Sequence, residues 1–295
     1  METHSVVDSL PSHHRDEAFE TLALSFAAGP MAQVDKRGVG EKIFEAVEKK
    51  MAKTGEEMSV ATAEAKKKRD EINFIGQFKK NIDHRNNSIT KSLYLLRKYG
   101  LINKKKKYKV IINKKIPVFA GLGGGTSNAV FLIKYFLKNK INEKLIKIFE
   151  KEIGSDFRLF FLKHSFQKNI KKILKFKKKK YNFYFILVYP SIHCSSKYIY
   201  SKVKKFNLPL TKDLSKIGSK RKYLQFLKSE KNDLQSIVEK KHHKIKKILN
   251  LIKLQKNCLF SRMSGSGSVC FGVFLDKNSA KLSLRVIQKK LPNYW

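Results

Sequence analysis

The stretch that decides the fold is a glycine-rich run, which reads Pro117-Val118-Phe119-Ala120-Gly121-Leu122-Gly123-Gly124-Gly125-Thr126-Ser127-Asn128-Ala129. It follows a β-like stretch at 108–112 and precedes an apolar helical stretch at 130–137. Unpaired backbone N–H groups and the helix dipole stabilise an anion, most often a phosphate, at such a helix N-terminus. Glycine is needed there because a side chain would block close approach or forbid the required φ angles. The run therefore predicts a phosphate-binding loop.

Two other interpretations of this run are a Walker A loop and a flexible connector. It is not a Walker A loop, because no Gly-Lys-Ser/Thr follows the glycines. A flexible connector remains the alternative, but three consecutive glycines between a strand and a helix favour the phosphate loop. Thr126 and Ser127 add hydroxyls that could meet phosphate oxygens, or a Mg²⁺ held by those oxygens.

A second small-residue run, Ser264-Gly265-Ser266-Gly267-Ser268, lies between two β-type stretches at 258–263 and 269–274. Taken alone, it fits a hairpin turn, because glycine-rich turns routinely join strands. Taken with the first run, it is interpreted as another wall of one anion site.

Asp156 follows Ile153-Gly154-Ser155 and precedes an apolar stretch. An Asp just before a helical stretch is a common N-cap. The alternative is a carboxylate that acts as general base beside a substrate hydroxyl. From the residues alone, the cap is the favoured interpretation.

The chain has 295 residues and a formal net charge of +40, which first suggests a nucleic-acid partner. Residues 1–70 carry 11 Lys/Arg and 13 Asp/Glu, so the remaining residues carry 53 and 11. Because lysine is spread over every expected element, a general compositional bias is favoured over a dedicated surface, and no specific nucleic acid is predicted. A basic nucleic-acid-binding protein stays an alternative.

Three features bear on the compartment. The odd number of cysteines, Cys194, Cys258 and Cys270, implies no closed disulfide framework and fits a reducing cytoplasm. The N-terminal residues lack the basic start and apolar run of a signal peptide. No apolar run approaches the ~18 residues of a membrane span. We expect a cytoplasmic protein without a membrane partner; the oligomeric state stays open.

The composition changes sharply near residue 70, which divides the chain into 1–70, 71–165 and 166–295. The first segment has too few large apolar residues for its own core, and we expect it to be helical or disordered, with one amphipathic helix at 41–53. The rest mixes strands and helices without strict alternation, which favours an α+β fold. Its expected elements include strands at 72–78, 108–116 and 183–189, and helices at 88–99, 143–152, 220–228, 234–252 and 279–290.

Together these motifs resemble the GHMP kinases, a family of small-molecule kinases. Its second motif, Pro-x-Gly-Ala-Gly-Leu-Gly-Gly-Gly-Ser-Ser-Asn-Ala, matches 117–129, and its third motif matches Met263 to Ser268. The Gly-Ser/Ala-Asp-Val-Pro-Phe-Phe segment matches 154–160, and Asn-Asp-Leu matches 232–234. The resemblance covers 72–295. It implies a two-domain α+β architecture with 71–165 as a partial N-terminal domain and 166–295 as the C-terminal domain.

The three-glycine form resembles the subgroup that phosphorylates the 2-hydroxyl of a cytidine-diphosphate-linked methylerythritol, with ATP and Mg²⁺, in non-mevalonate isoprenoid synthesis. By this resemblance Asp156 becomes the base-like catalytic residue, with phosphoryl transfer resting on positioning and charge stabilisation. The residues expected to bind the nucleotide are Asn87, Pro117, Ala120, Gly121, Leu122, Gly123, Gly124, Gly125, Thr126, Ser127, Asn128, Gly265, Ser266 and Gly267.

The chain also departs from the family pattern. The opening Pro-Ala-Lys-Ile-Asn-Leu, whose lysine partners the aspartate, and the Gly-Tyr-His that helps hold the cytidine do not occur in 1–71. Arg158 stands where the family has proline. We therefore expect an incomplete N-terminal domain, unpaired sheet edges and lowered turnover. An inactive nucleotide-binding remnant is the alternative to an active kinase.

Overall fold

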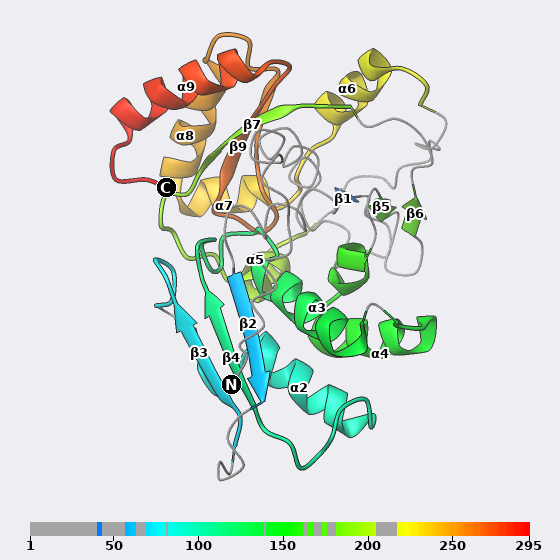
Figure 1. Ribbon diagram of the computed structural model, residues 1–295. Coiled ribbons are helices and arrows are strands. Elements are labelled where there is room, and N and C mark those ends of the chain that lie inside the picture. Colours follow the sequence, from blue (N-terminus) through cyan, green and yellow to red (C-terminus); the bar gives the residue numbers. More distant parts are fainter. Residues whose placement is uncertain are drawn as a thin grey trace. The chain divides into compact units, whose positions relative to one another are not determined.

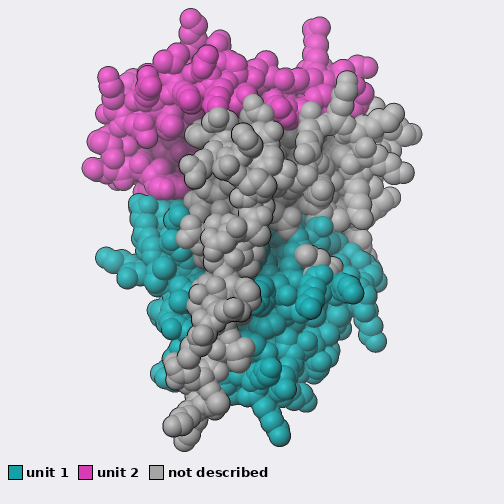
Figure 2. Space-filling view, viewed as in Figure 1, with its two compact units in different colours: residues 1–15, 48–118, 123–161 teal, residues 16–47, 119–122, 162–295 magenta. Residues whose placement is uncertain are grey.

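The computed structural model describes residues 40–42, 57–62, 69–80, 82–138, 140–161, 165–167, 173–175, 181–204 and 217–295. They belong to two compact units, coloured separately in Figure 2. Among the described residues, unit 1 holds those from 57 to 118 and from 123 to 161. Unit 2 holds 40–42, 119–122 and everything from 165 onward. The glycine-rich run thus passes from unit 1 to unit 2 after Val118 and returns to unit 1 after Leu122.

Unit 1 is built on a three-stranded sheet of order β2-β4-β3, formed by Glu57–Thr62, Tyr108–Asn113 and Glu71–Ile75 (Figure 1). β3 and β4 are parallel, because α2 (Ser88–Lys98) forms the crossover between them. β2 pairs antiparallel with the other edge of β4, from Glu57 opposite Asn113 to Thr62 opposite Tyr108.

The core of unit 1 lies between this sheet and two helices, α2 and α3 (Gly124–Leu137). The inward residues alternate along the strands, as expected for a sheet with one face buried. Their buried set is Phe74, Ile89, Leu93, Tyr108, Val110, Ile112 and Leu132. Next to it, α4 (Glu143–Ile153) packs on a 3-10 helix, η5 (Phe157–Phe161), where the rings of Phe149 and Phe157 lie 5.7 Å apart.

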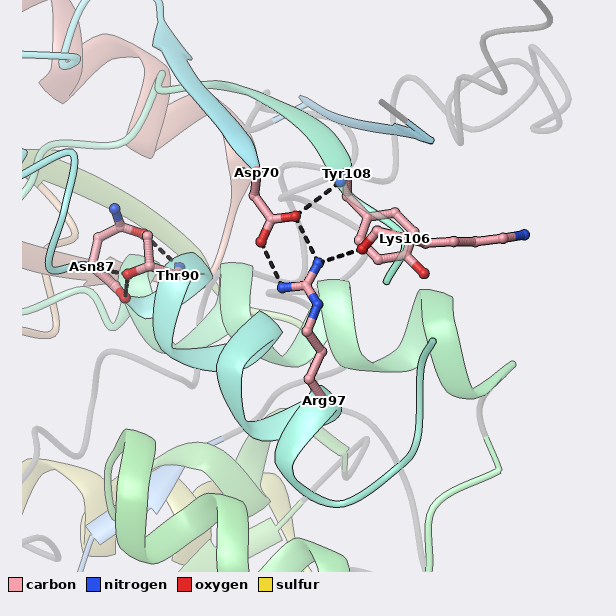
Figure 3. Close-up of polar contacts among 6 residues, drawn as sticks. All are labelled: Asp70, Asn87, Thr90, Arg97, Lys106 and Tyr108. Atoms are coloured by element: carbon pink, nitrogen blue, oxygen red, sulfur yellow. Dashed lines mark hydrogen bonds and ion pairs between the residues drawn. The ribbon is translucent and has the colours of Figure 1, made fainter. Parts of the chain in front are cut away.

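A charged fork joins the beginnings of β3 and β4 to the end of α2 (Figure 3). Both oxygens of Asp70 accept from the Arg97 guanidinium, at 2.6 and 2.7 Å. Asp70 also accepts from the Tyr108 N–H at 2.9 Å, and Arg97 donates to the Lys106 carbonyl at 2.9 Å. A bidentate Arg–carboxylate pair is directional as well as strong, so it holds these three segments in register.

Unit 2 is built on an antiparallel sheet of order β7-β9-β8, formed by Tyr184–Val188, Cys270–Phe274 and Phe260–Met263. One face packs on α7 (Gln235–Lys241), α8 (His243–Lys253) and α9 (Lys277–Lys290). The other face packs on α6 (Lys220–Ser229). All five residues of β9 are buried, which explains its uninterrupted apolar sequence. The same unit contains α5 (Ser196–Ser201) and a small sheet, β1-β5-β6, formed by Gly40–Lys42, Ser165–Gln167 and Ile173–Lys175.

The structure confirms an α+β fold and most of the expected helices and strands, but two expectations are wrong. The helix expected at 234–252 is two helices, because the backbone at His242 (φ −132°, ψ 82°) leaves the helical region. Within 1–70, expected to be helical or disordered, Gly40–Lys42 and Glu57–Thr62 form strands. β2 gains a full ladder on β4, and that tertiary pairing outweighs its weak local preference. The remainder of the helix expected at 41–53 lies outside the described residues.

Candidate active site

Residues 119–122 of the glycine-rich run belong to unit 2, where they contact the second small-residue run. Gly121 has φ +75°, a conformation that favours glycine. A Cβ at Gly121 would lie 2.2 Å from the Ser264 carbonyl oxygen, so the two backbones are in close contact only because Gly121 has no side chain. The Ser264 hydroxyl donates to the Gly121 carbonyl at 2.8 Å, and the Val269 N–H donates to the Ala120 carbonyl at 3.3 Å. Leu122 packs on the apolar cluster under α6.

The second part of the run forms the N-terminus of α3 in unit 1. Gly123 is the N-cap, with φ +69°, and its carbonyl accepts from the Ser127 N–H at 3.0 Å. A Cβ at Gly125 would lie 3.8 Å from the Ser88 hydroxyl, so the first turns of α2 and α3 are neighbours. Two helix N-termini side by side add their partial positive charges, which favours an anion. The predicted phosphate loop thus has the strand–loop–helix setting that its sequence indicated.

Asp156 lies at the same end of unit 1, between α4 and η5. It is 7% exposed, and its carbonyl accepts from the Leu159 N–H at 3.0 Å, which begins the 3-10 turn. A Cβ at Gly123 would lie 4.0 Å from Oδ2 of Asp156. The fold therefore brings the Asp156 carboxylate beside the residue that opens α3, although 33 positions separate them in sequence.

Arg158, which stands where the family has proline, ties η5 to α4. Its guanidinium pairs with Glu143 and with Glu150, the latter at 3.4 Å. Burial raises the pKa of Glu150, and the nearby Arg158 opposes that rise. The substitution thus replaces a rigid residue by an ionic link that holds the segment following Asp156.

Asn87 caps α2, and Figure 3 shows its contacts with Thr90. Its Oδ1 accepts from the N–H groups of Ile89 and Thr90, at 2.9 and 3.0 Å. Its Nδ2 donates to the carbonyls of Asp83 and His84, at 3.0 and 3.2 Å. These four bonds saturate a primary amide. Nucleotide binding by Asn87 stays a prediction, and the geometry favours a contribution through the loop that Asn87 shapes.

The second small-residue run forms the connection between β8 and β9 and is buried. Gly265 and Gly267 have φ +56° and +89°, and the Gly267 N–H donates to the Ser264 carbonyl at 2.9 Å. The hydroxyls of Ser266 and Ser196 lie 2.7 Å apart, so this loop also contacts the first turn of α5. The run joins two paired antiparallel strands, as the hairpin interpretation predicted. Its role in anion binding stays a prediction.

Among the remaining predicted residues, Pro117 and Asn128 are buried, and Gly124 and Thr126 lie in the loop and first turn of α3. Sequence patterns did not assign Ser88 to the site, because its only signal is its position as the first helical residue after the Asn87 cap. Ser264 begins the second run, which was interpreted as a wall of the anion site.

Lys134 is a partly buried cation of α3, on the C-terminal side of the predicted phosphate loop. It donates to the Phe160 carbonyl at 2.9 Å, and its ammonium lies 4.9 Å from the centre of the Phe161 ring. Burial lowers the pKa of Lys134 to about 8. The charge of Lys134 therefore changes with pH near neutrality. Lys134 contacts η5, the segment that follows Asp156.

The described part of the chain contains no group of three or more His, Cys, Asp or Glu side chains placed to hold a metal ion. None of the helices that the structure describes has the length and apolar character of a membrane span.

Comparison with known proteins identifies the family. Residues 87–156 match the GHMP kinases N terminal domain, and residues 210–293 match GHMP kinases C terminal. A relative from Pelagibacter ubique (strain HTCC1062), named 4-diphosphocytidyl-2-C-methyl-D-erythritol kinase, is 36% identical over 80% of this chain and 84% of its own length. A relative of the same name from Wolbachia pipientis wMel is 30% identical over 81% and 83%.

The fold agrees with these matches. A crystal structure titled 4-(cytidine 5'-diphospho)-2C-methyl-D-erythritol kinase superposes with a TM-score of 0.54 and 15% identity, covering 89% of this chain and 91% of that one. Sequence and fold together show that this chain belongs to the GHMP kinase family of ATP-dependent small-molecule kinases.

Proposed function

We propose that this chain transfers the γ-phosphoryl group of ATP to the 2-hydroxyl of 4-diphosphocytidyl-2-C-methyl-D-erythritol, a step of isoprenoid precursor synthesis. The proposal rests on a relative named 4-diphosphocytidyl-2-C-methyl-D-erythritol kinase, which is 36% identical to this chain over 84% of the relative's own length. The three-glycine form of the phosphate loop supports the same substrate class.

In this proposal the α3 N-terminus binds the phosphates of ATP. Backbone N–H groups and the helix dipole offset the negative charge that phosphoryl transfer spreads over the phosphate oxygens. Thr126 and Ser127 supply hydroxyls at the same turn. Little covalent chemistry is then left to the protein, so the rate depends on how the hydroxyl and the phosphate are positioned.

Asp156 is the residue proposed to accept the proton of the attacking hydroxyl. Its carboxylate lies beside Gly123, which opens the phosphate-binding helix, and its burial restricts its motion. A general base must reach the proton that it abstracts in the bound complex, and a position next to the phosphate loop meets that requirement.

Mg²⁺ is the metal proposed to accompany ATP. Mg²⁺ prefers oxygen ligands and is usually bound through one or two carboxylates and substrate phosphates. The hydroxyls of Thr126 and Ser127 are oxygen donors at the turn that would hold those phosphates. Bound there, the ion would neutralise part of the phosphate charge.

The assay is release of ADP that depends on 4-diphosphocytidyl-2-C-methyl-D-erythritol, with ATP binding measured separately. We expect turnover with this substrate and none with homoserine or mevalonate. Because the lysine of the family's opening motif is absent from 1–71, we expect a lower rate than in relatives that carry it. Absence of ADP release from folded protein would overturn the proposal, and ATP binding without turnover would identify an inactive remnant.

A matched pair of variants tests Asp156. Asp156→Asn keeps the shape but removes the base, and should lower kcat by about 10²-fold or more while ATP still binds. Asp276→Asn is the control, because Asp276 is an exposed N-cap of α9 that accepts from the Ser279 N–H at 2.7 Å. That control should leave kcat unchanged. Equal turnover in both variants would exclude Asp156 as the base.

A further inference from the structure

The Asn-Asp-Leu motif at 232–234 has no role in the mechanism above, yet its first residue contacts the loop between β8 and β9. Asn232 is 6% exposed. Its Nδ2 donates to the carbonyls of Met263 and Gly265, at 2.9 and 2.8 Å. Its Oδ1 accepts from the Leu234 N–H at 2.9 Å, just before α7. Both amide protons of one buried side chain are therefore used to hold a loop about 30 residues away in sequence.

These bonds determine how the loop presents its backbone. In a trans peptide the N–H points opposite to the C=O of the same plane. The Gly265 carbonyl points to Asn232, so the N–H of Ser266 points away from Asn232. Gly265 has φ +56°, and a glycine at this position could adopt several other backbone conformations. An external bond to its carbonyl selects one of them.

The same loop is bonded to the glycine-rich run within unit 2. The Ser264 hydroxyl donates to the Gly121 carbonyl at 2.8 Å, and Ser264 lies between the two carbonyls that Asn232 holds. A displacement of the loop would therefore disturb the backbone at Gly121, where the Cβ position is already filled by the Ser264 carbonyl. Asn232 thus acts on both predicted nucleotide-binding segments of this unit.

We infer that Asn232 is a positioning residue of the kinase, which holds the N–H groups of Gly265 and Ser266 in the orientation in which this predicted nucleotide-binding loop meets phosphate oxygens. The inference rests on the proposed function. Preorganised N–H donors stabilise charge that develops in the transition state more than charge in the ground state, because they need no reorganisation during the reaction. Loss of Asn232 should therefore lower kcat more than it raises the KM for ATP.

The decisive variant is Asn232→Asp, which keeps the acceptor for the Leu234 N–H but replaces the amide donors by an oxygen facing two carbonyls. We expect kcat to fall by about 10- to 100-fold per folded molecule, with a smaller change in the KM for ATP. Asn257→Asp is the matched control, because that exposed amide donates only to the Ser279 hydroxyl, at 2.8 Å, among the described contacts. The control should keep the native kcat and KM.

A second variant covers the case in which Asn232→Asp does not fold. Asn232→Ser keeps a short acceptor for the turn and one donor, so it should fold and retain an intermediate kcat. Native kcat in a folded Asn232 variant, with only a lower unfolding midpoint, would overturn the inference and leave Asn232 a structural residue.

A direct nucleotide-binding measurement separates this inference from the proposed substrate. If the native chain shows no turnover, the comparison is made on binding of ATP and of a planar mimic of the transferred phosphoryl group together with ADP. Asn232→Asp should weaken the mimic complex more than the ATP complex. Equal affinities in the native chain and the variant would refute the role of Asn232, whatever the substrate is.

Discussion

Replacement of Gly121 by alanine tests whether the close contact between the two glycine-containing loops determines the nucleotide-binding geometry. Gly121 has φ +75°, and a Cβ would lie 2.2 Å from the Ser264 carbonyl oxygen and 3.1 Å from that of Gly267. Real Cβ atoms essentially never approach within 3.0 Å of another heavy atom, so one backbone must move. Both neighbours are backbone atoms, which no rotamer change can displace.

The cost has two parts. A left-handed conformation costs a non-glycine residue about 1 kcal/mol. Inserting a methyl group into a filled space costs about 1–3 kcal/mol, and the movement weakens the Ser264–Gly121 hydrogen bond. We therefore expect Gly121→Ala to lower the free energy of unfolding by about 3 kcal/mol. Gly100→Ala is the control, because Gly100 has φ +67° but nothing within 4 Å of its Cβ position, and it should cost about 1 kcal/mol.

Urea unfolding followed by far-ultraviolet circular dichroism measures both variants, since that signal reports on helices in both units. Nucleotide affinity is measured in parallel and should weaken in Gly121→Ala alone. If the two variants lose equal stability and both bind ATP as the native chain does, the contact with Ser264 has no energetic role and the reasoning is refuted.

Three further changes probe unit 1. Burial lowers the pKa of Lys134 from its ordinary 10.5 to about 8, so the unfolded chain binds more protons than the folded chain between these pH values. The contribution of Lys134 to stability therefore rises with pH across that window, and the native chain should gain stability relative to Lys134→Met between pH 7 and pH 10. An unchanged difference in unfolding free energy between the two proteins would contradict this. Asn87→Ala removes a capping box and should cost about 1 kcal/mol in thermal or urea unfolding, whereas Asn87→Ser should recover most of it; equal losses would argue against the cap. Phe149→Ala empties a fully buried position against Phe157 and should cost about 3–5 kcal/mol by urea unfolding, well above Phe149→Leu; a loss below 1 kcal/mol would show that the site collapses.

The elements that sequence patterns predicted well are those whose signals are local. The helix beginning at Ser88 follows an Asn cap and ends before Gly100, which has the left-handed conformation expected after a helix. The strands at 184–188 and 270–274 are continuous apolar runs because the sheet is buried on both faces. Such signals depend only on neighbouring residues in the chain, so they can be recognised without knowledge of the fold.

Sequence patterns failed where a distant segment decides the outcome. The strand at Glu57–Thr62 has an ordinary local sequence and is a strand because β4 offers it a complete ladder. The break at His242 carries no proline or glycine that would announce it. From the residues alone, Asp156 was favoured as a cap with a general base as the alternative, and the resemblance to a family made the base the favoured interpretation. The proximity of its carboxylate to Gly123 required the packing of η5 against α3.

By itself, the sequence identified the family and predicted a phosphate-binding run at 117–129 with the residues available for its chemistry, because glycine spacing and helix starts are local properties of the chain. The tertiary structure alone decided which of these residues meet. It placed the Asp156 carboxylate beside Gly123, used the Asn87 side chain in a cap, and joined Asn232 through two carbonyls to the 264–267 loop. The reason is that hydrogen bonds and close contacts depend on distances in space, which a linear order of residues does not contain.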